Sequence, residues 1–361
     1  MPDHVEVTVW RVPTPLPRPV LTPLGPFDTF FHLVVTAEDS DGTRGWGYSA
    51  LPTVELLDDT VRCACELVRH AAPTLAGLLG VEHAAVGPVF GGTVRNAAAN
   101  AIALAAWDLA GRRLGLACAD LWGRRPHTDS VLAYASGFFL DGSPGDLRRE
   151  AEGYHAAGFR LVKMRVGLDV ETDLQRLGVV RAMFPDPGQI AVDAVSAWSA
   201  ADTEAFVAGA GPGLLWVEDP IPYAELPSLA FLRAPLAAGE SLESAGELAE
   251  LARLAHLDHV LLDVQRLGGP TRFLAAASAL AEQGFGIGAH INTASSVHLL
   301  ACLDAPLPVE VFDWSDPLFA RPPAPGADGR VPVAGPGFGV DLDEDVLRRH
   351  GQVMTWAALD P

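Results

Sequence analysis

Short apolar segments separated by helix-length connectors recur from residue 131 to residue 312, and this alternation most constrains how the chain can fold. The segments, which we expect to be strands, are Val131–Ser136, Phe159–Arg165, Ile190–Asp193, Leu214–Glu218, Leu236–Glu240, His259–Asp263, Phe285–His290 and Val309–Phe312. Helical stretches lie between them, for example at Gly145–Ala157, Asp169–Phe184, Glu243–Ala255 and Arg272–Glu282. Eight strands alternating with helices predict an α/β fold of the (β/α)8, or TIM-type, barrel class. An open doubly wound sheet is the structural alternative, but it would more often carry a glycine-rich dinucleotide fingerprint, and the sequence contains none.

The first 125 residues follow a different pattern, with strands first and helices afterwards. Residues 3–12 alternate as a strand, and two further strands, Phe30–Ala37 and Thr43–Ser49, flank a hairpin turn. Helical spacing then begins near Val54 and includes a long alanine-rich helix over Asn96–Leu114. We therefore predict an α+β capping domain over residues 1–125, completed by the C-terminal tail 324–361, and a barrel domain over residues 126–323.

A proline-rich segment, Pro13–Pro19, interrupts the first domain. Proline cannot donate a backbone hydrogen bond, so this segment predicts an extended loop that runs to about Phe27. We expect the stretch from Thr14 to Phe27 to fold over the mouth of the barrel and to set substrate specificity. Its few polar side chains favour a lid more apolar than a long polyol would prefer, which keeps a small or partly apolar hydroxy acid in consideration.

The charge balance excludes several classes of partner. The chain has 25 basic and 45 acidic residues, for a formal net charge of −20, whereas nucleic acids and anionic membranes require a basic surface. No segment reaches the roughly 18 uninterrupted apolar residues of a membrane span, and the N-terminal stretch has no apolar core for a signal peptide. The four cysteines show no metal or redox spacing and are expected to be free thiols. We expect a cytoplasmic homo-oligomer that acts on a small-molecule carboxylate, with no nucleic-acid or membrane partner.

Ionisable side chains end every predicted strand from the second to the eighth. One acid at the end of a strand is usually a helix N-cap or a surface charge. Seven strands in succession are difficult to explain in that way, and in a barrel the carboxyl ends of the strands form the active-site face. The candidate site residues are Lys163, Arg165, Asp193, Glu218, Glu240, Asp263, His290 and Glu310.

Three of these residues form a candidate metal site. Asp193, Glu218 and Glu240 end successive strands and offer only oxygen ligands. Oxygen ligands suit a hard cation, so Mg²⁺ is the first choice and Mn²⁺ the second. The alternative is an acidic cluster without metal, which would leave three like charges close together without compensation.

Asp263 and His290 form a candidate acid–base pair. A carboxylate beside an imidazole fixes its tautomer and raises its pKa, which suits His290 to act as a general base and afterwards as an acid. Lys163 and Arg165 lie two residues apart on one strand and so point to the same side, which places two cations opposite His290. The alternative for these two cations is a salt bridge to the metal carboxylates.

Taken together, these residues resemble the enolase superfamily, and the Asp263–His290 pair resembles its mandelate racemase subgroup. The resemblance covers nearly the whole chain, because cap and tail segments also match family motifs. The matching segments are Lys163-Met164-Arg165, Trp216-Val217-Glu218-Asp219-Pro220, Gly239-Glu240, Asp263 with Gly268-Gly269, Ala106-Trp107-Asp108-Leu109-Ala110-Gly111 and Gly335-Pro336-Gly337-Phe338-Gly339.

The resemblance implies abstraction of the proton α to a substrate carboxylate, with Mg²⁺ stabilising the enediolate. It implies that Asp193, Glu218 and Glu240 hold the metal, that His290 oriented by Asp263 is the base, and that Glu310 hydrogen-bonds the substrate carboxylate. Lys163 would face the substrate.

Two positions depart from the family pattern. Arg165 stands where a second lysine base is usual, and a guanidinium is a poor base that more readily supplies charge. Val195 replaces an asparagine that is common two residues after the first metal ligand. These departures favour a dehydratase with one base, which forms a 2-keto-3-deoxy acid from a sugar acid or other hydroxy acid. A racemase or epimerase with Lys163 as second base is the alternative, and a non-catalytic barrel that binds metal and acid is a third possibility.

Overall fold

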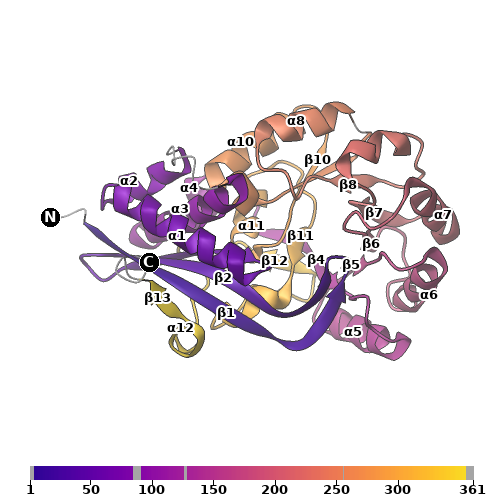
Figure 1. Cartoon of the computed structure of the whole chain (residues 1–361), viewed down its shortest axis with the longest axis horizontal. Helices are drawn as coiled ribbons and strands as arrows, with labels where there is room; N and C mark the ends of the chain where they lie inside the picture. The colour runs from indigo at the N-terminus through magenta and orange to yellow at the C-terminus, as the bar shows by residue number, and fades with distance from the viewer. Residues whose placement is uncertain (1–3, 84–90, 126–127, 255, 355–361) are drawn as a thin grey trace.

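The computed structural model of the chain describes residues 4–83, 91–125, 128–254 and 256–354. A small antiparallel sheet with its helices lies on one side, and a curled parallel sheet ringed by helices lies on the other (Figure 1). The predicted positions Pro126 and Ala255, and the last seven residues of the predicted tail, 355–361, lie outside the described residues. Within the described part, no helix is both long enough and apolar enough to cross a membrane.

The small sheet has the strand order β13-β1-β2-β3. Its strands are β1 (Val5–Thr22), β2 (Gly25–Asp39), β3 (Arg44–Leu51) and β13 (Gln352–Met354), and all neighbouring pairs are antiparallel. The chain near the C-terminus therefore returns to the first strand.

The predicted proline-rich loop is wrong, because β1 continues through the prolines to Thr22. The partner β13 pairs only with residues 9–11, so in the described structure β1 has no paired strand on that edge beyond Arg11. An edge strand tolerates the missing N–H groups of proline. Pro17 and Pro19 lie in the register irregularity between Pro15 and Val20, where strict pairing to β2 is interrupted.

Two helices, α1 (Val54–His70) and α3 (Gly92–Leu114), pack on one face of the small sheet, and α3 packs closest. The shorter elements pack against α3, and they are α2 (Leu75–Leu79), the 3-10 turn η1 (Gly80–His83) and α4 (Cys118–Leu121). A Cβ at Gly45 or Gly47 on β3 would collide with the backbone of α3, so glycine is required for this close approach. The expected helix over Asn96–Leu114 is confirmed and begins four residues earlier.

The large sheet contains eight parallel strands in the order β10-β9-β8-β7-β6-β5-β4-β11. They are β4 (Ser130–Gly137), β5 (Leu161–Arg165), β6 (Ile190–Asp193), β7 (Leu214–Glu218), β8 (Leu236–Ala238), β9 (His259–Leu262), β10 (Gly286–Ala289) and β11 (Val309–Val311). The short β12 (Arg330–Pro332) pairs antiparallel with β4. The predicted alternation of parallel strands with helices is therefore present.

Closure of this sheet is less complete than predicted. Strand pairing links every neighbour from β10 round to β11, but in the described residues no strand ladder joins β10 to β11. Only isolated contacts bridge that junction, such as the hydrogen bond from Leu307 N to Ile287 O at 2.9 Å. The structure therefore shows a curled sheet rather than a clearly closed barrel.

Helices follow most of these strands and surround the sheet (Figure 1). They are α5 (Pro144–Ala156), α6 (Val170–Arg181), α7 (Ala200–Ala210), η2 (Tyr223–Leu229), α8 (Ala245–Leu254), α9 (Val264–Leu267), α10 (Pro270–Ala281), α11 (Thr293–Leu300) and η3 (Asp313–Leu318). The remaining helix, α12 (Glu344–His350), lies beside β1 of the small sheet instead. Alternate strand residues such as Val162, Val192 and Val217 belong to a large apolar core that also includes residues of these helices. Side chains that point to the other face of the strands, such as Tyr134 and Trp216, form a separate small apolar cluster.

Candidate active site

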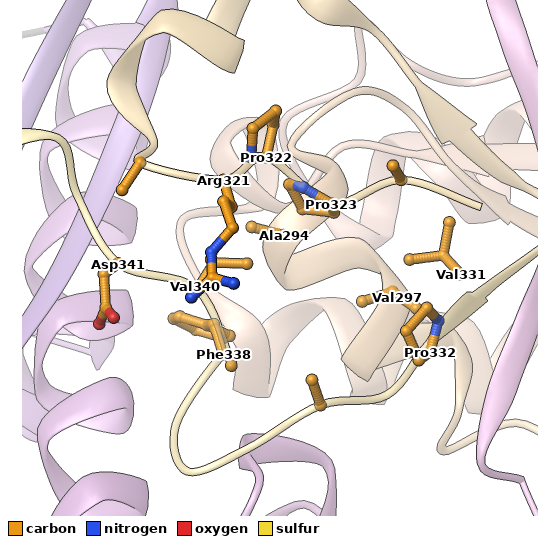
Figure 2. Close-up of a pocket in the computed structure, with 14 residues that line it drawn as sticks. Ala294, Val297, Arg321, Pro322, Pro323, Val331, Pro332, Phe338, Val340 and Asp341 are labelled. Carbon is orange, nitrogen blue, oxygen red and sulfur yellow. The ribbon is translucent and has the colours of Figure 1, made fainter. Parts of the chain in front are cut away.

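A cavity of about 460 Å³ lies between the carboxyl ends of the parallel strands and the hairpin formed by β1 and β2. Four sequence-predicted residues line it, namely Arg165, Glu240, Asp263 and His290. A second cavity of about 450 Å³ lies between α11 and the tail, where the side chain of Arg321 extends toward Val340 and Phe338 (Figure 2). This tail cavity contains none of the predicted site residues, so the chemistry belongs to the first cavity.

The three predicted metal ligands converge. One carboxylate oxygen each from Asp193, Glu218 and Glu240 lies within 4.8 Å of the other two. Asp193 and Glu218 end β6 and β7, and Glu240 follows β8 by two residues. Hydrogen bonds fix the first two carboxylates: Val195 N donates to Asp193 Oδ1 at 2.9 Å, and Trp216 Nε1 donates to Glu218 Oε2 at 2.9 Å.

This cluster fits a divalent cation. Glu240 Oε2 is buried and accepts no hydrogen bond, although His290 Nε2 lies 3.2 Å away. Burial raises the pKa of Glu218, and the ammonium of Lys163 does not reverse that shift. A cation among the three oxygens would satisfy the unpaired acceptor and lower the cost of holding these charges together.

Lys163 lies beneath the carboxylates rather than in the cavity. Its side chain is fully buried, and Nζ is 2.6 Å from Glu218, 2.9 Å from Glu310 and 3.4 Å from Asp193. Burial opposes its charge, but Glu218 and Glu310 outweigh that effect and raise its pKa above the usual range. The geometry makes Lys163 a permanent cation that compensates the acidic cluster.

Arg165 reaches the cavity from the same strand. Its guanidinium pairs with Asp193, lies 3.9 Å from Glu310 Oε1 and donates a long hydrogen bond to Ser136 Oγ at 3.4 Å. The guanidinium also lies 6.0 Å from the ring centre of Phe312. This arrangement places a fixed positive charge beside the metal cluster and open to the cavity.

His290 and Asp263 form the predicted pair. His290 Nδ1 lies 3.0 Å from Asp263 Oδ2. The other oxygen, Asp263 Oδ1, accepts from the backbone N–H groups of Gln265 and Arg266, so Asp263 also caps the short helix α9. Burial opposes the imidazolium, but Glu240 and the hydrogen bond to Asp263 outweigh that effect and raise the pKa of His290 to about 9.

Glu310 is fully buried and is not among the residues that line the cavity. Its Oε2 accepts from Ile291 N at 2.9 Å, and its Oε1 faces Lys163. Burial would raise its pKa, but Lys163 and His290 outweigh that effect and hold the pKa far below the usual range. Glu310 therefore stays ionised at the junction of β10 and β11.

Asp219 lines the cavity, although it is not among the candidate site residues predicted from the sequence. It adopts a left-handed backbone conformation with φ of 37°, and its Oδ2 accepts from the hydroxyl of Tyr223 at 2.9 Å. That hydroxyl also accepts from Gly239 N and Ser241 N, which fixes the loop that carries Glu240. Burial and then the charges of Glu240 and Glu218 raise the pKa of Asp219 well above the usual range. In the sequence, the pair of adjacent acids Glu218 and Asp219 was the signal that could have identified Asp219 as a site residue.

An aromatic wall faces the ionic groups, and its assembly was not foreseen. It consists of Phe27, Phe30, Phe139, Phe312 and Trp314. These residues come from β2, the segment after β4, and the segment after β11, so no local pattern in the sequence brings them together.

Comparisons with known proteins agree with this geometry. Residues 146–346 match the family described as Enolase C-terminal domain-like, and residues 4–123 match the N-terminal domain of the mandelate racemase / muconate lactonizing enzyme family. D-galactarolactone cycloisomerase of Agrobacterium fabrum is 27% identical, over 89% of this chain and 91% of its own length.

Solved structures match over nearly the whole chain. L-talarate dehydratase from Polaromonas sp. JS666, complexed with Mg and L-glucarate, has a TM-score of 0.80 at 27% identity, covering 97% of this chain and 98% of that one. A racemase from Streptomyces coelicolor with bound magnesium has a TM-score of 0.81 at 26% identity, covering 97% and 99%. These relatives are a cycloisomerase, a dehydratase and a racemase, so similarity to them does not identify which reaction this chain would catalyse. The site combines the acidic triad of Asp193, Glu218 and Glu240 with the Asp263–His290 pair. Because both family domains also match, the chain belongs to the mandelate racemase / muconate lactonizing enzyme group of the enolase superfamily.

Proposed function

We propose that the chain is a Mg²⁺-dependent enzyme that removes the proton α to a carboxylate and dehydrates a hydroxy acid to a 2-keto-3-deoxy acid. The observation that carries the proposal is the Asp263–His290 pair, which lines one cavity together with Arg165 and with Glu240, a member of the acidic cluster of Asp193, Glu218 and Glu240. In this proposal Asp193, Glu218 and Glu240 hold Mg²⁺. When bound, the ion supplies positive charge that stabilises the enediolate form of the substrate carboxylate.

The chain's own groups perform the proton transfers. With the charge of Glu240 offset by the metal, the neutral form of His290, held by Asp263, accepts the proton from the α-carbon. As imidazolium it then donates a proton to the hydroxyl on the β-carbon, which leaves as water, and the resulting enol becomes the keto acid. Arg165 adds fixed charge beside the substrate carboxylate. Lys163 and Glu310 keep the buried charges of the site in balance.

Dehydration is favoured over racemisation because it requires a single base. A racemase needs a competent base on each face of the α-carbon, and the alternative assigns that role to Lys163. Lys163 is fully buried, paired with three carboxylates and absent from the cavity lining, which counts against this role. The third possibility is a non-catalytic barrel that binds metal and acid. In that case no acid would exchange its α-proton when it is bound.

The family fold supports two further proposals. We propose that the eight parallel strands close into a (β/α)8 barrel, because structures that match at TM-scores of 0.80 and 0.81 cover nearly all of the chain. We also propose the division into a capping domain of residues 1–125 with the tail 324–361, and a barrel of residues 126–323. Assembly as a homo-oligomer and a cytoplasmic location stay predictions.

Exchange of the α-proton in D₂O tests the function. With Mg²⁺ and a library of hydroxy acids, we expect loss of water and formation of a 2-keto acid that carries deuterium at C3, where the enol takes up a proton from solvent, together with deuterium at the α-carbon of recovered substrate. Exchange with inversion and no loss of water would select the racemase, and no exchange with any acid would select the binding barrel.

His290→Asn provides the matched variant. It should abolish exchange and turnover while leaving Mg²⁺ affinity nearly unchanged, because the imidazole is not one of the three metal ligands. Calorimetric titration with Mg²⁺ checks the second half of this expectation. Full activity in this variant would remove His290 from the mechanism.

A further inference from the structure

The two halves of the active-site cavity differ in chemistry. Ionic side chains, among them Arg165, Glu240 and His290, lie at the carboxyl ends of β5 to β10. The opposite half is built by the β1–β2 hairpin and by the segments after β4 and β11, and its large side chains are apolar or aromatic. They are Leu24, Phe27, Phe30, Phe139, Phe312 and Trp314.

Trp314 organises this aromatic half. Its ring stacks on Phe139 with centroids 5.3 Å apart and lies 4.7 Å from Phe312. Phe27 and Phe30 pack against the same indole at 5.5 and 5.0 Å. Five rings thus form one continuous surface, and such rings bind apolar and aromatic groups far better than hydrated ones.

This half offers little to a chain of hydroxyl groups. The one hydroxyl on the hairpin that lines the cavity, Thr22 Oγ1, already donates to Gly25 O and accepts from Leu24 N, both at 3.1 Å. Hydroxyls of a polyol pressed against the aromatic wall would lose water without gaining partners, which costs free energy for each one.

The tip of the hairpin has the same character. Leu24 lines the cavity and yet is 72% exposed, an unusual position for a large aliphatic side chain. The tip is held in place, since Leu140 N donates to Leu21 O at 2.9 Å and Leu21 N donates to Asp141 Oδ1 at 3.1 Å. An apolar group in the cavity would cover Leu24 and remove its side chain from water.

From these observations we infer that the substrate is a 2,3-dihydroxy acid whose substituent beyond C3 is apolar, either aromatic or branched alkyl, and not a polyhydroxylated chain. This inference rests on the proposed function for its reacting end. There the C2–H bond and the C3–O bond break, one water leaves, and the enol formed becomes the 2-keto acid. The aromatic half of the cavity receives the substituent.

Binding to an inactive variant tests the inference separately from the reaction. The His290→Asn variant loaded with Mg²⁺ should bind a stereoisomer of 2,3-dihydroxy-3-phenylpropanoate at least tenfold more tightly than L-glucarate in calorimetric titrations. Tighter binding of L-glucarate, or equal binding of the two acids, would overturn the inference.

The wild-type enzyme separates the two proposals. Exchange in D₂O with the phenyl-substituted acid supports both. Exchange with L-glucarate alone overturns the inference while the proposed function stands. No exchange with either acid, despite tighter binding of the phenyl-substituted acid, supports the apolar site and counts against the dehydration of such acids.

Phe27→Asn tests the aromatic wall itself. This variant should weaken binding of the phenyl-substituted acid about tenfold, and should leave L-glucarate binding unchanged within twofold. Phe231→Asn is the matched control, because Phe231 is 94% exposed beside α7 and does not line the active-site cavity. Equal effects of the two substitutions, or no effect of Phe27→Asn, would remove the aromatic wall from substrate recognition.

Discussion

At the scale of single residues, the buried charges of the site balance one another through Lys163. Its ammonium lies within 3.4 Å of carboxylate oxygens of Asp193, Glu218 and Glu310, and none of these four side chains is exposed. A buried charge that loses its partner is expensive, whereas a well-paired one is tolerated. Lys163 therefore contributes to the stability of the native site in addition to any influence on the substrate.

Replacement of this lysine should therefore be measured as a loss of stability. We expect Lys163→Met to lower the free energy of unfolding by about 3–5 kcal/mol without Mg²⁺, because it leaves buried carboxylates unpaired. Saturating Mg²⁺ should recover part of that loss, since the cation compensates the same carboxylates. Urea unfolding with and without Mg²⁺ checks both statements. Unchanged stability together with lost α-proton exchange would instead assign Lys163 to catalysis as a base.

The sequence predicted which of these residues meet, but not how deep each one lies. Residues at the ends of parallel strands share one edge of the sheet, so the meeting of Asp193, Glu218 and Glu240 follows from strand order alone. Lys163 and Arg165 point to the same side of β5, yet one is enclosed and the other lines the cavity. Arg165 is the last residue of β5 and lies next to the cavity, whereas Lys163 lies two residues earlier on the strand and therefore deeper in the sheet.

At the scale of elements, the β1–β2 hairpin connects the small sheet to the active site. The hairpin extends across the molecule to the region of β4, β5 and α5 (Figure 1). Its tip contacts the segment after β4, where Asp141 accepts from Leu21 N and pairs with Arg18 at 2.7 Å. Both residues are partly exposed, so this pair orients the hairpin and adds little to overall stability.

Loss of this contact should affect substrate binding more than folding. We expect Asp141→Ala to raise KM about threefold to tenfold, with kcat changed less than twofold, because the apolar tip is then held less firmly over the cavity. The unfolding free energy should change by less than about 1 kcal/mol. Steady-state kinetics with the preferred acid measures the first effect.

Glu344→Ala is the control for this prediction. Glu344 pairs with Arg44 at 2.7 Å on the surface, and it does not line the cavity. A rise in KM of similar size in both variants would show that the effect does not come from loss of the contact between Asp141 and the hairpin.

The hairpin also shows where reasoning from local sequence failed. Prolines normally exclude a segment from a sheet interior, and Pro13–Pro19 was accordingly predicted as a loop. The segment lies at an edge where its missing donors are not needed, and only the strand order of the folded sheet reveals that edge. The predicted position over the mouth of the site agrees with the cavity lining at Thr22, Leu24 and Phe27.

At the scale of the whole molecule, buried polar contacts join the small sheet to the large one. Gln265, which follows Asp263, exchanges two hydrogen bonds with the backbone of Ala50 on β3, both at 2.9 Å. His32 on β2 contacts Thr14 Oγ1 on β1 at 3.1 Å and Ser315 Oγ on η3 at 3.0 Å. The strand edge that carries the candidate site is therefore fixed to the small sheet through polar groups that must remain paired.

His32 makes this junction sensitive to acid. It is fully buried, and burial lowers its pKa from the usual 6.5 to about 3. The unfolded chain therefore binds a proton between about pH 6.5 and pH 3 that the folded chain does not, so the stability due to neutral His32 is lost as pH falls through that window.

A comparison of variants isolates this effect from other titrating groups. The stability difference between wild type and His32→Gln should shrink by about 1.4 kcal/mol from about pH 7.5 to about pH 5.5, because glutamine binds no proton in either state. Urea unfolding at the two pH values measures the difference, and His70→Gln at the exposed end of α1 is the control. A His32→Gln difference that is equal at both pH values would mean that His32 takes up a proton equally in the folded and unfolded chains, which would contradict the prediction. A difference that grows as the pH falls would mean that the folded chain holds the extra proton, and the contact with Ser315 would then join the two sheets through a charged group instead of a neutral one.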